Sequence, residues 1–420
     1  MAVPNFCPSC GKNNEYPAAQ FCSHCGKQFS VETSGQLATN PTELVLHSDP
    51  DVRAYQVEWG NLSTEILTKL SKDRSVRVRE AVACNPGTPS PVINHLADAS
   101  NEVVRSAAAS NLNAPLETLR RLRYDRSEMV RERLAGNPST PADLLATLAK
   151  SLSSMVVATA LRNPNISKEM LDEYGRSEDE RERFAVADNA RVPKALLSKL
   201  AADHAALVRM GVARNKQTPA SLLNQLALDP DDEVRCEVAW NPQTPLPTLE
   251  KLISDKDEYV RAAVASSPLM RPALLEMLAR DSEPVVLESV AGHPNTPLNL
   301  LEALARSSFK EARWGVTQNP NTPSELLEAL SEDKSSLVRN GVASNRNTPG
   351  RTLISLAKDP DSDIRYRVAS NPSAPKDALE ILRFDSDDKA RVLAGLALGV
   401  QIEGMEQLTG AIRVFAQGES

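Results

Sequence analysis

The chain has 420 residues, of which 48 are Lys or Arg and 55 are Asp or Glu, so its formal net charge is −7. With 41% hydrophobic and 25% charged residues, it has the composition of an ordinary folded protein, which excludes a disordered chain and a general polyanion binder. Because only 4% of the residues are aromatic, the core has to consist of Leu, Val and Ala, which suits thin helical layers better than one large globule.

The sequence gives no sign of a membrane segment or a secretion signal. No apolar run reaches the roughly 18 residues that a membrane span requires. The first ten residues lack both the basic region and the apolar region of a secretory signal peptide. We therefore expect a cytoplasmic protein without a membrane partner.

Two C-x-x-C-G motifs open the chain, and they predict a zinc ribbon over residues 1–30. Each motif can place two thiolates on one ion from a tight turn, and two such turns complete a tetrahedral shell. Because all four positions are then protein ligands, none is left for an activated water, and we expect the Zn²⁺ to be structural. The predicted ligands are Cys7, Cys10, Cys22 and Cys25.

This N-terminal segment resembles the short ribbons that open many bacterial multidomain proteins. An iron–sulfur cluster also accepts four cysteines and stays open as the alternative. Thirty residues cannot build a core without the metal, so we expect the ribbon to be unfolded without it. Residues 31–39 have the Ser, Thr and Gly composition of a linker.

A 26-residue repeat occupies residues 40–395. In steps of 26 from Asn85 to Asn371 there are twelve positions, and ten are Asn; the other two are Ser267 and His293. A second column of fourteen positions from Arg53 to Arg391 is Arg at all but two, where Val157 and Leu287 stand. This regularity predicts about fourteen turns of a repeat protein, followed by a C-terminal cap and tail over 396–420.

Each turn predicts two short helices. We expect Thr140 to cap the first helix, Pro141 to occupy its first turn and Asp143 to complete a capping box. Leu and Ala follow at helical spacing, and a second helix carries Val and Ala on its buried face. This second helix should end at the next Asn-Pro, because Asn tolerates left-handed backbone and Pro cannot continue a helix.

A helix pair this short cannot bury its apolar face alone, so the pairs must stack into a solenoid. The repeat motif N-P-x-T-P-x-x-L-L-x-x-L-A-x-D-x-x-x-x-V-R-x-x-V-A resembles the leucine-rich repeat variant and, in its D-x(5)-R element, a shortened HEAT repeat. The resemblance covers about 85% of the chain. It implies an all-α, right-handed solenoid, with one α-helix and one 3₁₀-helix in each pair, that serves as a binding scaffold.

The Arg column has two interpretations. One guanidinium per turn would make a basic stripe for nucleic acid or another acidic partner. An Asp recurs six residues before the Arg, as in Asp203 and Arg209, so an internal ladder of Arg with Asp or carbonyl groups explains the column without a ligand. The repeats have no local excess of Lys and Arg, which also argues against nucleic acid.

The second helices carry unusually large apolar residues in a few consecutive turns, at positions that should point away from the core. These candidates for partner binding are Phe184, Leu207, Met210, Trp240 and Tyr259, with Cys236 among them. Apolar residues of this size on a surface mark an interaction site. The competing interpretation is that the twist of the solenoid or a loop covers them.

No pattern supports an enzyme. The five histidines fall at unrelated repeat positions, and the sequence contains neither a G-x-x-x-x-G-K loop nor a G-x-S-x-G elbow. The main hypothesis is a non-enzymatic scaffold that binds a protein partner. The alternatives are a nucleic-acid-associated protein that uses the ribbon, and a redox or assembly protein with an iron–sulfur cluster.

Overall fold

The computed structural model describes residues 49–60 and 62–399. The predicted zinc ribbon, the linker and residues 400–420 therefore lie outside the described residues. Within them the regular secondary structure is entirely helical, with 27 α-helices and no strand. The prediction of an all-α helical-repeat solenoid is confirmed for this part of the chain.

The described residues form two compact units, one ending at Gln217 and the other starting at Thr218. The helices of the first unit are α2 (Pro50–Trp59), α3 (Thr64–Leu70), α4 (Val76–Cys84), α5 (Ser90–Leu96), α6 (Glu102–Ser110), α7 (Leu116–Leu122), α8 (Glu128–Gly136), α9 (Ala142–Leu148), α10 (Ser154–Arg162), α11 (Lys168–Tyr174), α12 (Glu180–Ala187), α13 (Lys194–Leu200) and α14 (Ala206–Arg214). Those of the second unit are α15 (Ala220–Leu226), α16 (Asp232–Trp240), α17 (Leu246–Leu252), α18 (Glu258–Ala265), α19 (Pro272–Leu278), α20 (Pro284–Gly292), α21 (Leu298–Leu304), α22 (Lys310–Gln318), α23 (Ser324–Leu330), α24 (Ser336–Ser344), α25 (Gly350–Leu356), α26 (Ser362–Ser370), α27 (Lys376–Leu382) and α28 (Asp388–Leu398).

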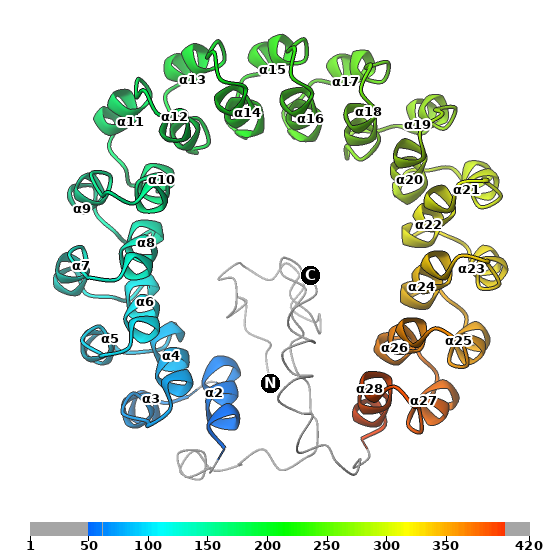
Figure 1. Ribbon diagram of the computed structural model, residues 1–420, viewed down its shortest axis with the longest axis horizontal. Helices are drawn as coiled ribbons and strands as arrows, with labels where there is room; N and C mark the ends of the chain where they lie inside the picture. The colour runs from blue at the N-terminus through cyan, green and yellow to red at the C-terminus, as the bar shows by residue number, and fades with distance from the viewer. Residues whose placement is uncertain (1–48, 61, 400–420) are drawn as a thin grey trace. The chain divides into compact units, whose positions relative to one another are not determined.

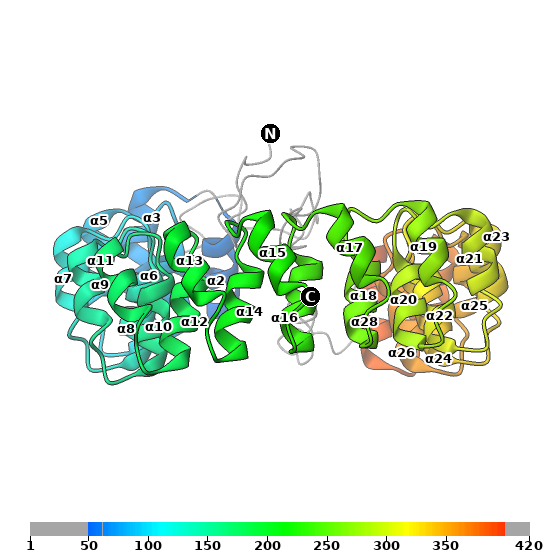
Figure 2. The same ribbon diagram turned by 90° about the horizontal axis from the view of Figure 1, so that it is seen from above.

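Each unit has two rows of helices. Consecutive even-numbered helices pack against one another, as α6 does on α8 and α20 on α22, and the odd-numbered helices form a second row behind them (Figure 1). Figure 2 shows the same helices from the side, standing next to one another within each unit. Within each unit a layer is therefore one odd and one even helix, and its main contacts are with the layers before and after it in that unit.

The Leu and Val residues predicted to face the core are buried there. Leu144, Leu145 and Leu148 of α9 are at most 2% exposed, and Val208 and Val212 of α14 are fully buried. These side chains fill the space between the two rows. The i, i+1, i+4 pattern of the first helix and the i, i+4 pattern of the second are thus the core pattern of the repeat.

The predicted capping arrangement is wrong. The N-cap of α9 is Pro141, with φ −69° and ψ 157°, and the helix begins one residue later at Ala142. Thr140 instead donates its hydroxyl to the carbonyl of Leu134, 2.6 Å away in the preceding helix. Asn137, which ends α8, has extended backbone with φ −71° and not the left-handed conformation that we expected. The Thr140 hydroxyl therefore holds this turn to the preceding helix, and no left-handed residue is needed.

The helix type also differs from what the resemblance implied. Within residues 49–60 and 62–399 both helices of each pair are α-helices, usually seven and nine residues long, and no 3₁₀-helix occurs. Isolated helices of this length are marginal in water. Packing between layers must therefore supply most of their stability.

The stacked layers predict that damage to the core stays local. We expect Leu145→Ala to cost about 2–5 kcal/mol because a buried Leu leaves a cavity. Hydrogen exchange should show lost protection in α8, α9 and α10 and little change in layers farther away. Leu152→Ala is the control, because Leu152 is fully exposed. Uniform loss of protection from α2 to α14 would contradict nearest-neighbour stacking.

Candidate functional site

The Arg column forms an internal ladder of ion pairs. In eight layers within the two units, the Arg of one layer donates through Nε and Nη2 to both carboxylate oxygens of the Asp that lies 20 residues later, with Nε–Oδ2 distances of 2.6–2.8 Å. The pairs are Arg53–Asp73, Arg105–Asp125, Arg183–Asp203, Arg235–Asp255, Arg261–Asp281, Arg313–Asp333, Arg339–Asp359 and Arg365–Asp385. Each pair joins one layer to the next.

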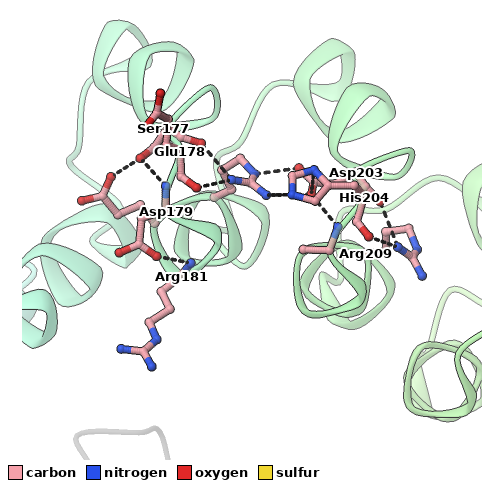
Figure 3. A network of polar contacts seen from close by, with 10 residues as sticks. Ser177, Glu178, Asp179, Arg181, Asp203, His204 and Arg209 are labelled. Atoms are coloured by element: carbon pink, nitrogen blue, oxygen red, sulfur yellow. Dashed lines mark hydrogen bonds and ion pairs between the residues drawn. The ribbon is translucent and has the colours of Figure 1, made fainter.

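The layer junction around Asp203 shows all the bonds of this ladder (Figure 3). Arg183 binds the Asp203 carboxylate at 2.7 and 2.9 Å, and its Nη1 donates to the carbonyl of Ser177 at 2.8 Å. The carboxylate also accepts the backbone N–H of Ala205 at 2.9 Å. Arg209 in turn donates to the Asp203 carbonyl at 2.9 Å. Asp203 therefore accepts hydrogen bonds from two Arg side chains. Its backbone carbonyl accepts from Arg209, six residues later, and its carboxylate accepts from Arg183, 20 residues earlier, in the preceding layer.

These contacts shift the pKa of both partners. Burial by itself would raise the pKa of Asp203, but the hydrogen bonds from Arg183 and from the Ala205 N–H outweigh it and hold that pKa below its usual value. The hydrogen bond to Asp203 raises the pKa of Arg183. Both groups thus stay charged at neutral pH, and most of the Arg column is bound internally and not free to form a basic stripe.

The two layers that lack the Arg also lack its Asp. Val157 stands at one of these positions, and the residue 20 later is Ser177; Leu287 stands at the other, with Ser307. In both layers the Ser Oγ accepts the backbone N–H two residues later, at 3.1 Å from Asp179 and 3.2 Å from Phe309. A buried carboxylate without its guanidinium would be costly, and the paired replacements avoid it.

The Asn column forms a second ladder. The Asn137 amide donates to the carbonyls of Ala109 and Asn111 at 2.8 and 3.1 Å, and its oxygen accepts the N–H of Ser139 at 2.8 Å. His293 replaces Asn with the same bonding pattern, since Nε2 lies 3.1 Å from the Ser267 carbonyl and Nδ1 accepts an N–H at 3.0 Å. Burial lowers the pKa of His293, which keeps the ring neutral. The His293 ring and the backbone carbonyl of Ser267 therefore both take part in the ladder.

Two of the predicted partner-binding residues are well exposed on neighbouring helices of the second unit. Trp240 ends α16 and is 56% exposed, and Tyr259 near the start of α18 is 61% exposed. The small residues Cys236 and Ala262, 9% and 6% exposed, lie on the same helix faces at i, i+4 and i, i+3 spacing. Cys236 is thus buried, although its repeat position predicted that it points away from the core.

The other three candidates belong to the first unit and are half-buried. The Phe184 ring packs against Gly211, where an added Cβ would come within 2.8 Å of it, and lies 5.2 Å from the Arg162 guanidinium. Leu207 and Met210 are partly exposed on α14. Phe184 therefore contributes to the contact between α12 and α14, and partner binding by these three residues stays a prediction.

The sequence analysis missed two exposed methionines. Met129 on α8 and Met155 on α10 are 40% and 54% exposed, and the two helices pack against each other. They occupy the same repeat position as Tyr259 and Leu207, one that holds charged or small residues in most other turns. Comparing that one position along the whole repeat would have found them.

A cavity of about 320 Å³ between α18, α20 and α22 brings together acidic, aromatic, amide and imidazole side chains. Glu288, His293, Trp314 and Gln318 line it. Burial and the nearby Glu311 raise the pKa of Glu288. No nucleophile is paired with a base here, so the arrangement offers polar and aromatic contacts and no evident reaction.

The described part of the chain contains neither a cluster of metal-binding side chains nor a membrane-spanning helix. There, no three His, Cys, Asp or Glu side chains come together so that they could hold a metal ion. Among the same residues, no helix has the length and apolar character to cross a bilayer. The four cysteines predicted to bind zinc lie outside this part.

Neither protein-family models nor curated proteins gave a match to the chain. Among solved structures, a leucine-rich repeat variant is 25% identical, with 59% of this chain and 87% of that chain covered and a TM-score of 0.33. A chain from a structure of Kap95p with RanGDP is 12% identical, with 90% and 63% covered and a TM-score of 0.35. Importin beta is 11% identical, with 90% and 59% covered and a TM-score of 0.28. Similarity at this level assigns no function.

Because an unpaired buried charge is costly, removing only the Asp of a ladder pair should destabilise the protein more than replacing both the Arg and the Asp. Asp333→Ala leaves the guanidinium of Arg313, which is 7% exposed, without its carboxylate and should cost about 3–5 kcal/mol. The double variant Arg313→Leu with Asp333→Ser copies the Leu287–Ser307 layer and should cost less than half as much. Hydrogen exchange in α22 and α24 measures the local loss, and Glu332→Ala is the exposed control. A double variant less stable than Asp333→Ala would contradict this account.

Proposed function

We propose that the protein is a non-enzymatic scaffold whose helical solenoid, similar in its repeat to the leucine-rich repeat variant, binds another protein. The observation that carries this proposal is the exposure of Trp240 and Tyr259, 56% and 61%, on two helices that pack side by side. In a chain with only three Trp and six Tyr, two large aromatic side chains lie in solvent on neighbouring helices.

Two exposed aromatic side chains are costly to leave in water and valuable at an interface. Trp and Tyr are the residue types that most often dominate binding energy, because each buries a large area with few rotatable bonds. The buried Cys236 and Ala262 add small side chains on the same faces, over which a partner side chain can come close. Met129 and Met155 offer an adaptable apolar surface of the same kind in the first unit.

The ion-pair ladder favours a protein partner over nucleic acid. Neutralising the phosphates of a nucleic acid takes Lys or Arg side chains that are free to contact them. In eight layers the regularly spaced Arg is bound to a carboxylate, and the chain carries more acidic than basic residues. A protein surface does not require a positive field, so it fits these charges better.

The proposal also includes a metal site formed by the N-terminal cysteines. Cys7, Cys10, Cys22 and Cys25 would hold a structural Zn²⁺ in a module appended to the scaffold, with an iron–sulfur cluster as the alternative. Free Cys84 and Cys236 together with a thiolate metal site fit a reducing cytoplasm.

Trp240→Ala should separate binding from folding. Because the side chain is mostly exposed, its loss should change the free energy of unfolding by no more than about 0.5 kcal/mol. A partner that the wild type captures should bind at least about tenfold more weakly, since an interface Trp is often worth about 2 kcal/mol or more. Leu228→Ala, an 81% exposed residue in a turn of the same unit, is the matched control. A large drop in melting temperature would instead mean that Trp240 packs inside the fold.

Cys22→Ser should release most of the metal, because three ligands no longer close the shell. Metal analysis of anaerobically purified wild type should give about one zinc per chain without visible absorbance, whereas iron with absorbance would favour the cluster. Protease should then cut the first thirty residues of the variant, while its helical circular dichroism stays at the wild-type level. Cys84→Ser is the control, and a large loss of helicity on Cys22→Ser would contradict a separate module.

A further inference from the structure

Among the layers whose partner position is described, two have the Arg of the ladder but not its Asp, those of Arg79 and Arg131. Twenty residues after Arg79 stands Ala99, between layers in which Arg53 binds Asp73 and Arg105 binds Asp125. Arg79 keeps the other bonds of the ladder, since its Nη1 donates to the carbonyls of Asp73 and Arg74. Its guanidinium is therefore positioned as in the complete layers, while the chain supplies no carboxylate from the residue 20 later.

In the complete layers, the space beside the Arg guanidinium holds the carboxylate of an Asp. In the next layer the Asp125 carboxylate accepts Arg105 Nε and Nη2 at 2.7 and 2.9 Å and the backbone N–H of Ser127 at 2.8 Å. The corresponding donors at Ala99 are the Nε–Nη2 edge of Arg79 and the backbone N–H of Asn101. A guanidinium edge with one backbone N–H matches the geometry of a carboxylate and gives charge-assisted hydrogen bonds.

The space beside Arg79 and Ala99 opens into a groove. It has a volume of about 380 Å³ between the ends of α3 and α5 and the start of α4, and Arg79 and Ala99 both line it. Lys72 adds an exposed positive charge to its rim, and His95 adds an exposed imidazole. Its two carboxylates already have partners, because Asp73 is held by Arg53 and Asp98 lies 3.1 Å from Arg121. The groove therefore favours a negatively charged ligand.

The similar layer at Arg131 differs in one respect. Here Ser151 stands 20 residues later, and its hydroxyl accepts the backbone N–H of Ser153 at 3.2 Å. The side chain thus uses the N–H that a bound carboxylate would need. Ala99 has no polar atom in its side chain, so of these two described layers only that of Arg79 offers both donors together.

We propose that this groove binds an Asp or Glu side chain of a protein partner, whose carboxylate takes the two N–H groups of Arg79 and the backbone N–H of Asn101. The proposal goes beyond the scaffold function, because it adds a second site that is independent of Trp240 and Tyr259 and specifies the ligand chemistry. The carboxylate of the partner would then occupy the position that an Asp of this chain fills in the complete layers.

The test uses the full-length protein and a fluorescein-labelled hexaglutamate peptide, acetylated and amidated so that its carboxylates are side chains. Fluorescence anisotropy should show binding, and both Arg79→Leu and Ala99→Asp should weaken it at least about tenfold. Ala99→Asp should also raise the melting temperature, because the chain then completes its own ladder. Arg79→Leu copies a residue that the ladder already tolerates at Leu287, so loss of folding is not expected.

Ser151→Asp is the matched control, since it adds the same charge in the Arg131 layer and should leave peptide binding unchanged. A hexaglutamine peptide should not bind. Unchanged affinity in Ala99→Asp with a raised melting temperature would overturn the site, as would equal losses in Ser151→Asp. If free glutarate competes as well as the peptide, the site serves small carboxylates and the protein partner is wrong. Trp240→Ala should not affect peptide binding, so the two proposals fail separately.

Discussion

The bidentate ion pair between an Arg of one layer and an Asp of the next is the interaction on which the rest of the structure depends. A layer consists of helices of about seven and nine residues, too short to be stable alone. Apolar packing between layers gives cohesion, but the hydrophobic effect is non-directional and does not by itself fix one geometry. The guanidinium and carboxylate fix one geometry, and the Asn amide fixes a second point 26 and 28 residues back along the chain. Together they set the spacing of the layers.

The same ladder decides how charge is presented to solvent. Each Arg–Asp pair uses a cation that could otherwise contact an anionic partner, and its buried carboxylate keeps the Arg charged and in place. The surface is consequently free of a continuous basic stripe along these layers. Recognition has to come from positions where the repeat varies, such as Trp240 and Tyr259, or where the ladder is incomplete, as at Ala99.

Departures from the repeat follow physical rules and are not random drift. Where Arg becomes Val157 or Leu287, the Asp becomes Ser, so no buried charge is left alone. Where Asn becomes His293, a neutral ring still donates to one group and accepts from another. The Arg79 and Arg131 layers both keep the charge and lose its partner; Ser151 still accepts the backbone N–H of Ser153, whereas Ala99 has no side-chain atom that could do the same. Such an uncompensated change is where a ligand is expected.

The sequence by itself determined the helical solenoid, its period and the Leu and Val core, because each follows from residue type at a fixed spacing, and it left the Arg column open between internal bonding and a basic stripe. It did not determine that Thr140 bonds backward to Leu134, that Pro141 is the N-cap, or that Asp203 serves the Arg of the preceding layer. Those facts depend on where the next layer lies. Exposure was likewise decided by packing: Trp240 and Cys236 share one helix face, yet the Trp is 56% exposed and the Cys 9%.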